Sequence, residues 1–161
     1  MYPAAVAHVA TEHLGGGIVE EVELAASGLA HGHLNAVVLA WDSVTHGLSE
    51  PGDAHDVVLH EFAHALDFED RAFDGTPLLA TRAAYGAWGR AMQAEFAIHK
   101  SAAAAGTPTA IDAYGATNPA EFFAVLTEHF FERPVELRNR HPKLYAVLRE
   151  FYRQDPAESA T

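Results

Sequence analysis

Two histidines and a glutamate form the most informative pattern in this chain. Residues 60–64 read HEFAH, which matches the motif H-E-x-x-H. Residues four apart share one face of a helix, so the imidazoles of His60 and His64 can reach one metal ion. Glu61 lies about 100° further round the helix, where its carboxylate could take a proton from a water at that ion. The spacing therefore indicates a metal-dependent hydrolase.

Chance is the alternative explanation, because the chain holds 11 histidines in 161 residues. The context of the motif argues against chance. Apolar residues recur beside it at helical spacing, and we expect them to form a stripe that faces the core: Leu59, Phe62, Ala63 and Leu66. Two histidines and a glutamate would be costly to bury in such a helix without a function.

A catalytic zinc of this kind needs a third protein ligand, and Glu121 is the first candidate. It lies in the first turn of an apolar segment that follows Asn118. Glu128 and His129, on the same segment, are rival ligands. Glu121 could instead be a capping acid whose side chain reaches back to Asn118. Spacing alone leaves these alternatives open.

The elements that must position these residues are a small sheet and a set of helices. Alternating and β-branched runs predict strands at 18–25 and 36–41. Helical patterns cover 53–70, with Asp53 as N-cap, and then 82–100, 119–131, 135–140 and 142–153. The stretch SAAAAGTPTA at 101–110 ends as a loop. We therefore expect an α+β fold, a small sheet packed with helices, in one domain over residues 1–161.

Composition narrows the possible partners. The chain has 22 acidic residues against 10 Lys and Arg, a formal charge of −12, which argues against nucleic acid and anionic membranes as partners. It has no cysteine, so a bound metal must be held by histidine and carboxylate. Neither a signal sequence nor an apolar run of membrane-spanning length is present, and we expect a cytoplasmic location.

Four segments resemble a known family. They read VVLAWDSV at 37–44, VVLHEFAHALD at 57–67, DGTPLL at 74–79 and DAYGATNPAEFFAVLTEHFFE at 112–132. In this order they resemble the Mlc titration factor A peptidases, glucose-regulated bacterial zinc metallopeptidases of the gluzincin type. The resemblance continues to residue 156 and so spans nearly the whole chain.

The resemblance implies a role for each site residue. His60, His64 and Glu121 match the three ligands of one zinc ion per chain, and Glu61 matches the catalytic acid and base. Tyr114, seven residues before Glu121, matches the family's catalytic tyrosine. A neutral phenol there could stabilise the oxyanion of a tetrahedral intermediate. By its own sequence context, Tyr114 would be only a loop tyrosine.

Two features depart from the family pattern. Family members carry a longer helical part at the N-terminus, so this chain is expected to be a minimal catalytic core. Gluzincins often place an acid four residues after the glutamate ligand, where this chain has Val125. A carboxylate that orients a histidine ligand must then come from elsewhere. Asp67, three residues after His64, is the candidate, and a solvated acid at the helix end is the alternative.

The leading interpretation is a zinc metallopeptidase that cleaves peptides or unfolded proteins, either internally or as an aminopeptidase. The alternative is a binding module for an Mlc-like glucose repressor, in which the zinc is not catalytic. A purely structural zinc is a third reading, but such sites usually have four protein ligands. We also expect a peptide substrate to pair with residues 37–40 as an added strand, unless that strand is central and already paired on both sides.

Overall fold

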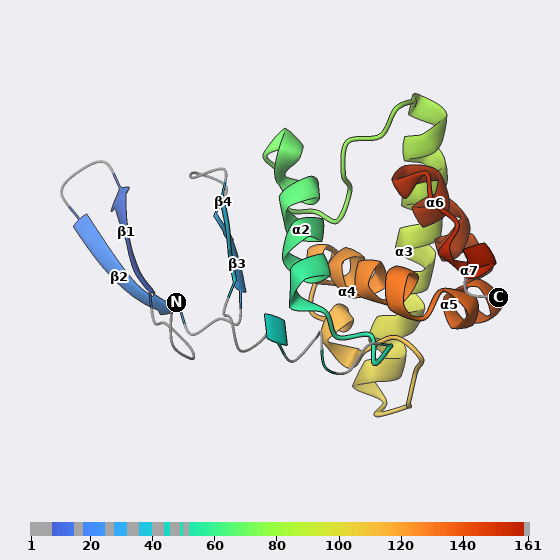
Figure 1. Cartoon of the computed structure of the whole chain (residues 1–161). Helices are drawn as coiled ribbons and strands as arrows, with labels where there is room; N and C mark the ends of the chain where they lie inside the picture. Colours follow the sequence, from blue (N-terminus) through green and yellow to red (C-terminus); the bar gives the residue numbers. More distant parts are fainter. Residues whose placement is uncertain are drawn as a thin grey trace.

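The computed structural model describes residues 8–14, 18–24, 28–31, 36–39, 44, 45, 49 and 52–159. Two antiparallel strand pairs precede the helices (Figure 1). Strand β1 (His8–Leu14) pairs with β2 (Ile18–Leu24), and β3 (Gly28–His31) pairs with β4 (Ala36–Leu39). Each described sheet consists of these two strands alone.

The other described elements are helices, joined by loops. Its elements are α2 (Val57–Asp67), the 3-10 helix η1 (Phe68–Asp70), α3 (Arg82–Ala104), the 3-10 helix η2 (Ala113–Ala116), α4 (Pro119–Glu132), α5 (Pro134–Arg140), α6 (Pro142–Tyr152) and α7 (Pro156–Ser159). None of the helices described is both long and apolar enough to cross a membrane.

The predicted α+β fold, with one small sheet packed with helices, is wrong. Residues 52–159 contain no strand, and their hydrophobic core is built from helices and the loops between them. The strands pair two by two with their neighbours in sequence, so the segments predicted at 18–25 and 36–41 do not meet in one sheet. Antiparallel neighbours need only a short turn, which makes such local pairs easy to form. Ala40 and Trp41, which belonged to the second prediction, lie outside the described residues.

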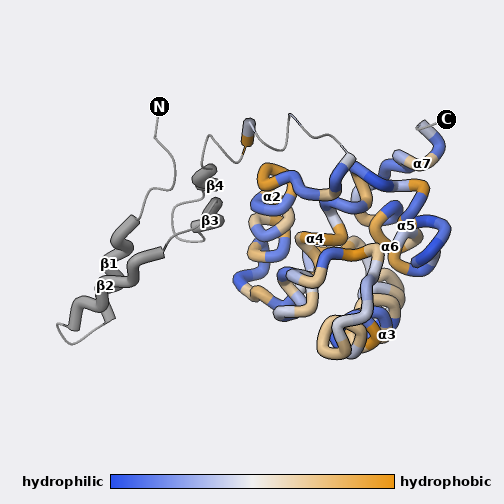
Figure 2. Tube along the Cα trace, turned by 90° about the horizontal axis from the view of Figure 1, so that it is seen from below, coloured by the Kyte–Doolittle hydropathy of each residue, from blue (hydrophilic) through white to orange (hydrophobic). Residues whose placement is uncertain are grey.

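Helix α4 is the centre of the helical part. It contacts α2, η2, α5 and α6, and Figure 2 shows its largely hydrophobic chain between α2 and α6. Ten of its residues are buried, among them Phe122, Phe123, Leu126 and Phe130. Aromatic rings close the core around it, and Trp88 of α3 packs edge-to-face on Phe123. A helix that is apolar on nearly all sides needs such surroundings.

Helix α2 begins at a different cap from the one that we predicted. Asp56 is the N-cap, and its carboxylate accepts the N–H groups of Val58 and Leu59. The predicted cap, Asp53, accepts only the N–H of His55 at 2.9 Å. Ala54 lies between them in the left-handed region, at φ 67°, so a helix cannot run through it.

The buried side of α2 also differs from the predicted apolar stripe. Its buried residues are Glu61, Ala63 and Asp67, whereas Phe62 is 54% exposed. The side of the helix that packs on α4 carries the polar residues of the motif. The prediction for Phe62 failed because it assumed that the apolar residues of this helix face the core.

Helix α3 runs four residues past its predicted end, to Ala104.

Candidate metal centre

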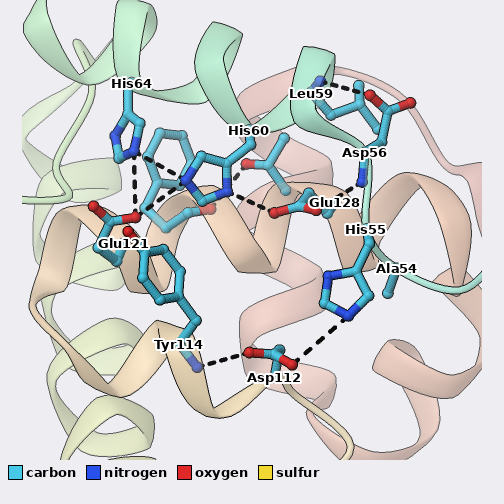
Figure 3. Close-up of polar contacts among 12 residues, drawn as sticks. Ala54, His55, Asp56, Leu59, His60, His64, Asp112, Tyr114, Glu121 and Glu128 are labelled. Carbon is cyan, nitrogen blue, oxygen red and sulfur yellow. Dashed lines mark hydrogen bonds and ion pairs between the residues drawn. The ribbon is translucent and has the colours of Figure 1, made fainter. Parts of the chain in front are cut away.

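His60 and His64 project from α2 toward Glu121 in the first turn of α4 (Figure 3). Three side-chain atoms form a small triangle. The Nε2 atoms of the histidines are 3.2 Å apart, and Oε2 of Glu121 lies 3.1 Å from His60 Nε2 and 3.4 Å from His64 Nε2. The three side chains are only 12–18% exposed. In the described part of the chain this is the one His, Asp and Glu group that could hold a metal ion.

The triangle fits zinc. Ligand atoms about 2.0–2.1 Å from a tetrahedral zinc lie about 3.4 Å from one another, close to all three edges here. Two imidazoles and one carboxylate are also a common donor set for catalytic zinc, which keeps its fourth position for water. His60, His64 and Glu121 could therefore hold one zinc ion with little movement of their side chains.

Local sequence explains why Glu121 faces the histidines. Asn118 caps α4 by accepting the N–H of Glu121 at 3.0 Å, and Pro119 begins the helix. The cap therefore uses the backbone of Glu121, while the side chain of Glu121 points to α2. The alternative hypothesis, that the Glu121 side chain reaches back to Asn118 as a capping acid, is therefore wrong.

Glu128 holds His60 from the other side. Its Oε1 atom accepts the Nδ1–H of His60 at 2.6 Å, and its Oε2 atom accepts the N–H of Asp56 at 2.7 Å. One carboxylate thus fixes both the ring and the start of the helix that carries it. A carboxylate behind a histidine ligand sets the tautomer and orientation of the ring. Our sequence reasoning had proposed Glu128 only as a rival ligand and missed this contact. The signal was the seven-residue spacing from Glu121, which puts both acids on one face of α4.

The two carboxylates also set the protonation of the cluster. Burial alone would lower the pKa of His60, but its hydrogen bonds to Glu121 and Glu128 outweigh burial and raise that pKa to about 9. Burial would likewise raise the pKa of Glu121, but its bonds to His60 and His64 lower it to about 2. With a pKa of about 9, His60 is protonated at neutral pH and lies between the carboxylates of Glu121 and Glu128, with one ring nitrogen near each.

Tyr114 lies beside the donor triangle, and Glu61 is on the same helix as the two histidines. The ring of Tyr114, on η2, lies 6.0 Å from the His60 ring, and Asp112 accepts the N–H of Tyr114 at 2.7 Å (Figure 3). Burial raises the pKa of the Tyr114 phenol, as do the charges of Glu121 and Glu61 and a hydrogen bond to Glu121. The phenol therefore stays protonated at neutral pH and can donate. Glu61 is 7% exposed, and its charge is one of those that raise the pKa of Tyr114.

Two other predicted candidates lie elsewhere. His129 is 1% exposed and faces Glu136 at 3.7 Å, and it does not belong to the cluster that could hold a metal. Asp67 does not orient His64. Its Oδ2 atom accepts the N–H of Gly75 at 3.0 Å, so it anchors the loop after η1. The prediction that Asp67 supports a histidine ligand is wrong, because Oδ1 of Asp67 and Nδ1 of His64 are both buried without a hydrogen-bond partner.

An H-E-x-x-H helix joined by a glutamate from a second helix is the arrangement of a metallopeptidase site. Comparison with known proteins gives the family. A family profile described as "Glucose-regulated metallo-peptidase M90" matches residues 1–153. The chain belongs to this family, as its resemblance to the Mlc titration factor A peptidases had indicated.

Several curated relatives are similar over most of this chain. An uncharacterized protein of Synechocystis, slr2042, is 42% identical over 141 residues, which are 88% of this chain and 51% of its own. Mlc titration factor A of Edwardsiella ictaluri is 40% identical over 125 residues, 76% of this chain and 47% of its own. That of Yersinia enterocolitica is 39% identical over 123 residues. The chain spans about half the length of these relatives.

Proposed function

We propose that this chain is a zinc-dependent metallopeptidase, with His60, His64 and Glu121 as ligands of one zinc ion. The observation that carries the proposal is the triangle of donor atoms, with edges of 3.1–3.4 Å, beside the buried Glu61 and the ring of Tyr114. A purely structural zinc would use four protein ligands, whereas this cluster offers three.

The residues around the triangle supply the remaining chemistry. Bound zinc would polarise the peptide carbonyl and make water more acidic. Glu61 accepts the proton of the attacking water and passes it to the leaving amine. Tyr114 donates its O–H to the oxyanion that forms on the carbonyl oxygen. Glu128 keeps the His60 ring in place throughout.

We propose peptides and unfolded proteins as substrates, bound in an extended form. Strand β4 pairs with β3 on one side, and both contact α2. The other edge of β4 has no partner among the described strands. An extended peptide could therefore pair with Val37–Leu39 and present one carbonyl to the zinc. A structure of a complex with a peptide-like inhibitor tests this binding mode. If the inhibitor backbone makes no hydrogen bonds to β4, a substrate does not bind as an added strand.

Glu61→Gln tests the catalytic proposal. The amide has nearly the shape of the acid but cannot accept the proton of the water, so hydrolysis should be almost lost while zinc is retained. Zinc content after dialysis is the control, because other histidines can bind stray metal. Mass spectrometry of the products distinguishes internal cleavage from stepwise aminopeptidase release. Activity within about threefold of the unaltered protein would rule out Glu61 as the base.

Binding of an Mlc-like repressor is the second candidate function, favoured by the names of the Edwardsiella and Yersinia relatives. A binding role would not need the general base. Purified repressor should then bind Glu61→Gln as tightly as the unaltered chain, and binding should survive removal of zinc. An unaltered protein that binds the repressor but cleaves no peptide would favour this function over the first.

A further inference from the structure

We propose that Phe73 and Phe68 form a subsite beside the metal centre, which takes a large apolar side chain, preferably aromatic, next to the scissile bond of a peptide. The inference rests on the proposed peptidase function and names a substrate preference for it. Nothing in the mechanism above uses these two rings.

The position of Phe73 carries the proposal. Its ring centroid is 6.2 Å from that of His64, a residue of the donor triangle. It stacks on Phe68 with centroids 4.8 Å apart and an interplanar angle of 27°. A substrate whose carbonyl reaches the metal would bring its neighbouring side chain within reach of this pair. Offset aromatic contacts favour flat, apolar partners.

Phe73 is also too exposed for a core residue. It is 51% exposed, so much of a large apolar ring faces water. Exposed apolar surface at the edge of a polar site is typical of ligand subsites, because burial of that surface on binding is favourable. Among the exposed large apolar side chains of residues 52–159, only Tyr114 and Phe73 have ring contacts with the histidine pair.

The loop that carries Phe73 is held on both sides. Before it, Arg71 adopts the left-handed conformation with φ 69°, and the N–H of Ala72 donates to Asp70 Oδ1 at 2.9 Å. After it, Gly75 donates to Asp67 and accepts the indole N–H of Trp88 at 2.9 Å.

These bonds fix the backbone near Phe73 before any substrate arrives. Little conformational freedom then remains to be lost on binding, which favours affinity for a side chain that fits the pair. The role of Asp67 follows as well, because its buried carboxylate positions this loop.

Inhibitor binding tests the subsite without turnover. Two dipeptide hydroxamates are compared on the zinc-loaded protein by calorimetry. They differ only in the side chain next to the hydroxamate, which is benzyl in one and methyl in the other. The unaltered protein should prefer the benzyl compound by about tenfold or more, the scale of a filled apolar pocket. Phe73→Ser should bring the ratio of the two dissociation constants close to one, and Phe73→Leu should leave an intermediate ratio.

Leu78→Ser is the matched control, since Leu78 is equally exposed, at 51%, but lines a different pocket between α3 and α6. It should keep the unaltered preference. An unaltered protein that binds both compounds equally, or a Phe73→Ser variant that keeps the preference, would overturn the subsite. A clear benzyl preference in a protein that hydrolyses no peptide would support the subsite and count against the proposed peptidase function alone.

Discussion

Replacement of Gly75 by alanine should damage both the fold and the metal centre. Gly75 is buried and has φ 76°, a conformation that L-residues adopt at a cost of about 1–2 kcal/mol. An added Cβ would also lie 2.3 Å from the carbonyl oxygen of Pro119 and 2.7 Å from its carbonyl carbon. Both are backbone atoms and cannot rotate away, so the loop or the start of α4 must move by nearly 1 Å.

The matched control is Gly106→Ala. Gly106 has a similar φ of 64°, but its added Cβ would have nothing within 4 Å. In this variant the free energy of unfolding should fall by about 1–2 kcal/mol, the cost of placing alanine in the left-handed conformation. Gly75→Ala should lose a further ~1–3 kcal/mol, the range for an overpacked site. Urea denaturation of both variants, with matched slopes, measures the difference.

Zinc affinity gives the second readout. Pro119 lies two residues before Glu121, so a shift at Pro119 displaces one edge of the donor triangle. Gly75→Ala should therefore bind zinc at least about tenfold more weakly, because ligand geometry must be held within about 0.5 Å. Gly106→Ala should bind it normally. Equal stability and equal zinc affinity in the two variants would refute the close approach of this loop to α4.

Three further predictions concern single side chains. Tyr114→Phe should lower kcat by about 10- to 1,000-fold with zinc affinity unchanged, and an unaltered kcat would exclude an oxyanion role. Zinc binding at pH 7 should displace about one proton from His60, whose pKa is about 9. Calorimetry in two buffers should find less proton release for Glu128→Gln than for the unaltered protein. Glu132→Gln, the control, should release the normal amount, because Glu132 accepts the backbone N–H of Ala54. Equal release in both variants would contradict the His60–Glu128 ion pair. Burial lowers the pKa of His129, so the unfolded chain takes up its proton first, and stability should fall as pH drops below about 6.5. In urea titrations, His129→Leu should reduce the loss of unfolding free energy at low pH. An unchanged pH dependence of stability in this variant would contradict the role of His129.

Local signals in the sequence predicted the parts of the site that depend on one element. The four-residue spacing of His60 and His64 places both on one helical face, and the structure brings their Nε2 atoms to 3.2 Å. The Asn118-Pro119 pair correctly predicted the start of α4, because a cap followed by proline acts within one turn.

Contacts between distant segments could not be predicted in the same way. His60 and Glu128 are 68 residues apart, and only the crossing of α2 over α4 joins them. Spacing favoured Asp67 instead, because it is close in sequence to His64. The predicted start of α2 at Asp53 was wrong for a related reason. Glu132 of α4, distant in sequence, accepts the N–H of Ala54 at 2.6 Å. Ala54 is in the left-handed conformation, so the helix cannot begin before Asp56.

The acidic residues of α4 explain how these contacts form together. Glu121, Glu128 and Glu132 are spaced seven and four residues apart, so they lie on one face of the helix. Glu121 contacts the two histidines, and Glu128 contacts the His60 ring and the Asp56 N–H. Glu132 accepts the Ala54 N–H. One helix therefore sets the start of α2 and the metal centre at once.

This arrangement also accounts for the balance of charge around the candidate metal centre. Three carboxylates along one helix face would repel one another and the charge of Glu61 if nothing balanced them. A proton on His60, favoured by a pKa of about 9, places a cation between Glu121 and Glu128. A bound zinc would be held by His60, His64 and Glu121, whose donor atoms lie 3.1–3.4 Å apart, and would take the place of the Nε2 proton of His60. Metal binding should thus require little rearrangement, and the zinc affinity should rise from pH 7 toward pH 9 as His60 loses its proton.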